Sequence, residues 1–71
     1  MKKYLNLGNN SSVLGYEYND DSITVYFANG SYTYSYATAG VENVKTMKKL
    51  ADRGCGLCSF IQRYVRNNYV K

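Results

Sequence analysis

The sequence predicts a small α+β domain, in which a three-stranded antiparallel β-meander is followed by two α-helices packed on one face of the sheet. Apolar and polar residues alternate as far as Tyr36, and from Val41 the apolar residues recur at helical spacing. A sheet with one apolar face and helices with one apolar stripe bury those surfaces against one another in two layers. The 71 residues suffice for one domain. We therefore expect a polar N-terminal lead-in over residues 1–10 and a single domain over residues 11–71.

The strongest local signal is the dipeptide Asn29-Gly30, which separates predicted strands over 22–28 and 31–36. Asn-Gly supplies the two residues with positive φ that a type I′ hairpin turn needs. The cross-strand pairs would then be Phe27 with Tyr32, Val25 with Tyr34 and Ile23 with Tyr36.

A first strand is expected over 13–18, with its turn in residues 19–22. A loop of two or four residues there would set Tyr18 against Ile23, Tyr16 against Val25 and Leu14 against Phe27. A slip of one residue would turn every apolar side chain to the wrong face, which favours this even-loop register.

Two helices are predicted, over 39–53 and 57–67. In the first, Val44, Met47 and Ala51 lie on one side, Thr38 is the expected N-cap, and Gly54 is the expected left-handed residue at the C-terminus. The second has the cleaner amphipathic spacing, formed by Leu57, Phe60, Ile61, Tyr64 and Val65.

Composition bounds the function. No histidine is present and there are only five carboxylates, so the sequence offers few groups for acid–base catalysis; we expect a non-enzymatic protein without a cofactor. No apolar run reaches the length of a membrane span, and the N-terminus is too polar for a secretory signal, so we expect a cytoplasmic protein. The net charge of +4 suits either solubility or an anionic partner.

Several motifs together point to a family. Ser11-Ser12-x-x-x-Tyr16, Ile23-x-Val25-x-Phe27-x-x-Gly30-x-Tyr32-x-Tyr34 and Gly54-x-Gly56-Leu57-x-Ser59-x-Ile61, with a late Tyr69, span residues 11–69. This pattern resembles the KTSC domain, a small domain named for the C-terminus of some lysyl-tRNA synthetases and also found as a free-standing bacterial protein. The sequence has Thr38-Ala39-Gly40-Val41 where the family commonly has Val-Pro, and Cys58 where a polar residue is expected. The resemblance implies RNA binding and no catalytic residue.

The tyrosines have two possible roles. Tyr16, Tyr18, Tyr32, Tyr34 and Tyr36 could stack on bases, but their predicted register places them on the face that the helices cover, which favours the core. Tyr26 lies on the opposite face and is a candidate contact for a partner chain, including a homodimer, or for a base.

The basic residues are the candidate nucleic-acid ligands. The first candidates are Arg53, Arg63 and Arg66. Arg63 and Arg66 have no acidic neighbour in the sequence, an arrangement that a phosphate backbone would favour, as would Lys71 at the end of the chain. Lys45 and Lys49 would assist in binding RNA or another polyanion. The alternative is an ordinary solvated helix face.

Cys55 and Cys58 form a Cys-x-x-Cys motif near the start of the second predicted helix. A helix N-terminus stabilises a thiolate, so the pair could be redox-active, with Cys55 the more reactive. The strand-rich region before it is not the βαβ context of thioredoxin, and two thiols without histidine leave a zinc site two ligands short. Two ordinary cysteines remain the simplest interpretation, and we expect no metal.

Overall fold

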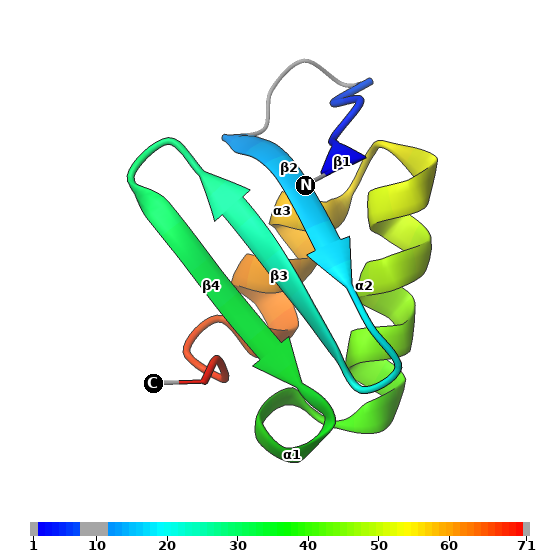
Figure 1. The fold of residues 1–71 in the computed structure, drawn as a ribbon, viewed down its shortest axis with the longest axis vertical. Coiled ribbons are helices and arrows are strands. Elements are labelled where there is room, and N and C mark those ends of the chain that lie inside the picture. The colour runs from blue at the N-terminus through cyan, green and yellow to red at the C-terminus, as the bar shows by residue number, and fades with distance from the viewer. Residues whose placement is uncertain (1, 8–11, 71) are drawn as a thin grey trace.

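A four-stranded antiparallel sheet forms one layer and the helices form the other (Figure 1). The computed structural model describes residues 2–7 and 12–70. The elements in chain order are β1 (Lys2–Lys3), β2 (Val13–Tyr18), β3 (Ser22–Phe27), β4 (Gly30–Ser35), α1 (Tyr36–Ala39), α2 (Val41–Arg53), α3 (Leu57–Phe60) and the π-helix η1 (Ile61–Val65). The predicted α+β class is confirmed, whereas the sheet has four strands and not three.

The additional strand comes from the segment predicted as a lead-in. Lys2 pairs with Tyr16 and Lys3 with Gly15, so β1 supplies hydrogen-bonding partners for the edge of β2. Tyr4 follows and is only 3% exposed, and its hydroxyl oxygen accepts a hydrogen bond of 3.3 Å from the backbone N–H of Leu57. Residues 1 and 8–10 of the predicted lead-in, and Ser11 of the family pattern, lie outside the described residues.

The register between β2 and β3 follows the prediction over most of its length. Tyr18 pairs with Ile23 and Tyr16 with Val25. The predicted pair of Leu14 with Phe27 is wrong, because a register shift between Val13 and Gly15 pairs Val13 with Phe27 instead. The bulge adds one residue to β2, so Val13 is buried while Leu14 is 54% exposed.

The β3–β4 turn is one place where the prediction fails. Ala28 and Asn29 form the turn and Gly30 pairs with Phe27, so the pairs shift by two residues, for example to Ile23 with Tyr34. Positive φ is found at Gly30 (142°) and not at Asn29, so the turn is not of type I′. A shift of two residues keeps every side chain on its predicted face.

The helix entries differ from the prediction, whereas the end of α2 does not. Thr38 is not the N-cap of α2 but closes a capping box with Ser35 around the short α1. Here the Ser35 Oγ accepts from the Thr38 N–H at 3.1 Å, and the Thr38 Oγ1 accepts from the Ser35 N–H at 3.1 Å. Gly40 then precedes α2, and Gly54, with φ of 87°, ends α2 as predicted.

The second predicted helix divides into α3 and η1 and ends at Val65. Leu57, Ile61 and Val65 are buried as predicted. Tyr64 is 57% exposed and therefore is not part of the buried stripe. A π-helix has a wider turn than an α-helix, so residues placed on one stripe by a period of 3.6 no longer all face the core.

The core lies between the sheet and the helices. Its largest fully buried side chains are Tyr34, Ile23, Met47, Leu57, Val25, Val44 and Val65. The predicted tyrosine face is therefore covered in part: Tyr16 and Tyr34 are buried, Tyr32 and Tyr36 are half-buried, and Tyr18 is 41% exposed. No helix in the described part of the chain is long and apolar enough to cross a membrane.

Candidate nucleic-acid interface

A groove of about 300 Å³ lies between the β3–β4 hairpin on one side and α3, η1 and the segment after η1 on the other. We call it the aromatic groove, because Phe27, Tyr32, Tyr34 and Tyr69 line it. Phe27 ends β3, while Tyr32 and Tyr34 alternate along β4 and so share one face of the sheet. The groove therefore brings together residues of the β3–β4 hairpin and residues of the C-terminal part of the chain.

The aromatic rings contact one another in a row centred on Tyr32. Its ring centroid lies 5.7 Å from that of Phe27 and 4.8 Å from that of Tyr69. Tyr69 also lies edge-on to Tyr34 at 6.2 Å. The Val70 N–H donates a hydrogen bond of 2.6 Å to the Thr33 carbonyl oxygen, which holds the C-terminal segment against β4. The aromatic wall is thus built by tertiary contacts between β3, β4 and the C-terminal segment.

Polar side chains also line the aromatic groove. Gln62 and Arg66 line it from η1 and its end, and Asn29 and Asn67 add side-chain amides. The Gln62 Nε2 makes a long contact of 3.6 Å with the Cys58 Sγ. No Asp or Glu lines the groove, and within residues 2–7 and 12–70 Arg66 forms no ion pair. The groove therefore combines aromatic faces with an unneutralised guanidinium group.

The five basic residues proposed from the sequence fall into two groups. Arg66, the residue after η1, lines the aromatic groove, and Arg63 is exposed on η1 itself. Lys45, Lys49 and Arg53 are exposed on α2. Figure 1 shows α2 along one side of the molecule and the segment after η1 on the other. The structure thus places Arg66 in the lining of the groove, whereas Arg63 does not line it and the three α2 residues lie away from it. Lys71 lies outside the described residues.

The two cysteines differ in their surroundings. Both are free and half-exposed. Cys58 lines the aromatic groove and also packs against the core, whereas Cys55 lies in the turn between α2 and α3. Across the described residues, no group of three or more His, Cys, Asp or Glu side chains is placed to hold a metal ion.

Tyr26 lies on the sheet face opposite to the helices, because it alternates along β3 with Val25, which is buried in the core. Its hydroxyl donates a hydrogen bond to Glu17 on the neighbouring strand, which raises the pKa of the phenol above its ordinary value. Beside it, the hydroxyls of Thr24 and Thr33 are hydrogen-bonded at 2.8 Å. Tyr26 is therefore hydrogen-bonded on this face of the sheet and does not line the aromatic groove.

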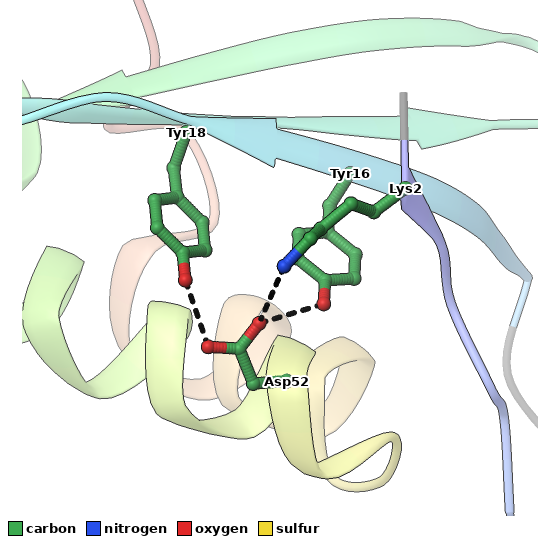
Figure 2. A network of polar contacts seen from close by, with 4 residues as sticks. All are labelled: Lys2, Tyr16, Tyr18 and Asp52. Atoms are coloured by element: carbon green, nitrogen blue, oxygen red, sulfur yellow. Dashed lines mark hydrogen bonds and ion pairs between the residues drawn. The ribbon is translucent and has the colours of Figure 1, made fainter.

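A second polar cluster joins β1, β2 and α2 (Figure 2). The hydroxyls of Tyr16 and Tyr18 donate hydrogen bonds of 2.7 and 2.8 Å to the two carboxylate oxygens of Asp52, and the Lys2 Nζ lies 3.8 Å from Oδ1. These hydroxyl donors hold the pKa of Asp52 below its ordinary value. Burial, and then the Asp52 carboxylate, raise the pKa of Tyr16 to about 12.

The Asp52 cluster is best explained as structural. Every polar group in it has a partner, and it attaches the short β1 to the end of α2. Lys48 adds to it, with its Nζ 5.3 Å from the Tyr18 ring centroid and 2.6 Å from the Asn19 carbonyl oxygen. Such satisfied networks specify how elements pack, and this one leaves no free group for a ligand.

Sequence reasoning did not find the aromatic groove. It assigned Tyr32 and Tyr34 to the core, which is confirmed for Tyr34 and in part for the half-buried Tyr32, but it did not connect them with Tyr69 as the lining of a groove. One local signal was available, because Gln62 and Arg66 are four residues apart and therefore share a helix face. No protein-family model, curated protein or solved structure matches the chain, so the resemblance to the KTSC domain stays a prediction.

Proposed function

We propose that the domain is a non-enzymatic module that binds single-stranded RNA in the aromatic groove, with a base stacked on the aromatic wall and a neighbouring phosphate paired with Arg66. The observation that carries the proposal concerns Arg66: it forms no ion pair with any described residue and lies on the edge of a groove whose described lining is rich in aromatic residues and contains no Asp or Glu. Aromatic side chains stack on bases of any sequence, and arginine pairs with phosphate oxygens in bidentate geometry.

The size of the groove supports a single-stranded ligand. Its volume of about 300 Å³ is at the lower limit for small-ligand pockets, which suits one nucleotide unit and is too small for a duplex. The net charge of +4 adds a long-range attraction for a polyanion. An RNA ligand is also what the KTSC resemblance implies.

The test compares two charge-neutralising variants by fluorescence anisotropy, with a labelled decauridylate as the probe. Arg66→Gln should weaken binding about tenfold, as expected for the loss of a charged hydrogen-bonded contact. Lys45→Gln is the matched control, because it removes the same charge from an exposed position on α2. Equal affinities for the two variants, or no binding by the wild type in 50 mM salt, would contradict the proposal.

Salt dependence provides a second readout of the same proposal. Each phosphate neutralised on a single strand should lower the affinity about 2.6-fold when salt rises from about 50 to 200 mM. Contacts by Arg63 and Arg66 together should therefore give a loss of about sevenfold. The double variant Arg63→Ala/Arg66→Ala should abolish most of this dependence, and an unchanged salt slope would exclude both residues as phosphate ligands.

A homodimer or protein-interaction module is the second candidate function. The observation in its favour is the sheet face around Tyr26, which no helix of the described chain covers. The strand edges favour it less, because β1 pairs with β2 and the segment containing Val70 hydrogen-bonds to β4. Light scattering tests the homodimer: a dimer that Tyr26→Lys converts to monomer supports this candidate, and a monomeric wild type at high concentration excludes its homodimer version.

A further inference from the structure

An exposed pair of aromatic rings lies on α3 and η1, outside the aromatic groove. The ring centroids of Phe60 and Tyr64 are 4.8 Å apart with an interplanar angle of 39°. Phe60 is half-buried and packs against the core, whereas Tyr64 is 57% exposed. Phe60 thus supports one side of the Tyr64 ring and leaves the other side open to solvent.

The ring pair and the aromatic groove lie on two flanks of the same helical segment. Cys58, Gln62 and Arg66 recur every fourth residue and line the groove, while Ile61 and Val65 are buried beneath. Phe60 and Tyr64 are also four residues apart but do not line the groove. A helix with its side chains is about 10–12 Å wide. The two aromatic surfaces are therefore separated only by the solvent-facing side of η1, which we call its crest.

Arg63 is exposed on this segment, between Gln62 of the groove wall and Tyr64 of the ring pair. Among the residues that the structure describes, Arg63 forms no ion pair, and no Asp or Glu occurs in 57–70. A chain that leaves the groove beside Arg66 would therefore meet a second free guanidinium before it reached the exposed ring. Alternating cationic and aromatic groups are the pattern by which proteins follow a single strand without sequence preference.

We infer that a single RNA strand bound in the aromatic groove continues across the crest of η1, with a phosphate on Arg63 and a further base stacked on Tyr64. This inference rests on the proposed function and extends it, because it adds a second base site. The ligand is a strand with at least two stacked bases, one in the groove and one on Tyr64. A fragment with a single base would occupy the groove and leave Tyr64 without a ligand.

The test compares a mononucleotide and a longer RNA with the same set of variants. The short probe is uridine 5′-monophosphate, which has a single base and is measured by NMR chemical-shift titration, and the long probe is the labelled decauridylate. Tyr64→Ala should weaken binding of the decauridylate about tenfold, within the range for loss of one stacked base, and leave binding of the mononucleotide unchanged. Arg66→Gln should weaken binding of both probes, because every complex uses the groove.

The control variants separate stacking from structure. Tyr64→Phe keeps the ring and should bind the decauridylate like the wild type, and Tyr64→Ser repeats the loss of the ring with another side chain. Tyr26→Ala removes a tyrosine from the opposite face of the sheet and should have no effect on either probe. Far-UV circular dichroism of each variant confirms that the fold is intact.

The outcomes distinguish failure of this inference from failure of the proposed function. A wild-type affinity of Tyr64→Ala for the decauridylate, or an equal loss for both probes, would overturn the second base site while the groove could still bind RNA. Absence of binding by the wild type to either probe would overturn the proposed function and this inference with it.

Discussion

The replacement Tyr34→Ala tests whether the tyrosines of β4 form the core or an open surface. Tyr34 is 2% exposed, pairs with Ile23 across the sheet and meets the ring of Tyr69 edge-on at 6.2 Å. Truncation to alanine would remove these contacts and leave a cavity between the sheet and η1. Because the surrounding backbone is regular β-structure, it has little freedom to collapse into that space.

The expected loss of stability is large for a chain of this size. Replacement of a buried large aromatic residue by alanine costs about 3–5 kcal/mol. A domain of 71 residues has a total free energy of unfolding of about 4–10 kcal/mol. Tyr34→Ala should therefore remove about half of the stability. Tyr34→Phe keeps the ring and loses only the hydroxyl, so it should cost about 1 kcal/mol or less.

Urea denaturation followed by far-UV circular dichroism measures both variants. The loss should appear as a lower midpoint at an unchanged slope, since the slope depends on the surface exposed during unfolding. A loss of less than about 1 kcal/mol for Tyr34→Ala would refute the reasoning. It would mean that the Tyr34 ring is not enclosed and that the whole β4 face is available for stacking on a ligand.

Three further predictions concern stability. The hydroxyl donors that lower the pKa of Asp52 stabilise the fold while the carboxylate is charged. In urea denaturation, the free energy of unfolding of the wild type should therefore exceed that of Asp52→Asn above pH 3.8, and the difference should shrink below it. A difference that is the same on both sides of this pH would exclude the charge as the cause. The pKa of Tyr16 is raised to about 12, so its contribution to the stability of the fold is complete below pH 10.0 and is lost as the pH rises toward 12. Raising the pH over this range should therefore destabilise Tyr16→Phe less than the wild type. Curves of unfolding free energy against pH that run parallel for the two proteins would contradict this. Gly54→Ala should lower the thermal unfolding temperature more than Gly56→Ala. Both glycines have φ above 80°, but only at Gly54 would the new Cβ lie 2.6 Å from the Leu5 Cβ. An equal decrease for the two variants would show that Leu5 moves freely.

The sequence by itself determined the class of the fold and most of the core. Alternation at a period of two places Tyr16, Ile23, Val25 and Tyr34 on one face, and all four are buried. The error at Asn29 changed the partners across the hairpin but not the faces, because a shift of two residues preserves the alternation. Gly54 was predictable as a helix end for a similar local reason: a left-handed backbone strongly favours glycine.

Tertiary structure decided the features without a local period. The two residues of β1 are too few to show an alternation, and they form a strand only because the edge of β2 offers free backbone groups. The bulge that exposes Leu14 and the π-helical turn that leaves Tyr64 in solvent both interrupt the period from which their burial was predicted. The aromatic groove depends still more on the path of the chain. Phe27, Arg66 and Tyr69 meet there because the helical layer packs back across the sheet, and such packing is set by the whole core rather than by any one segment.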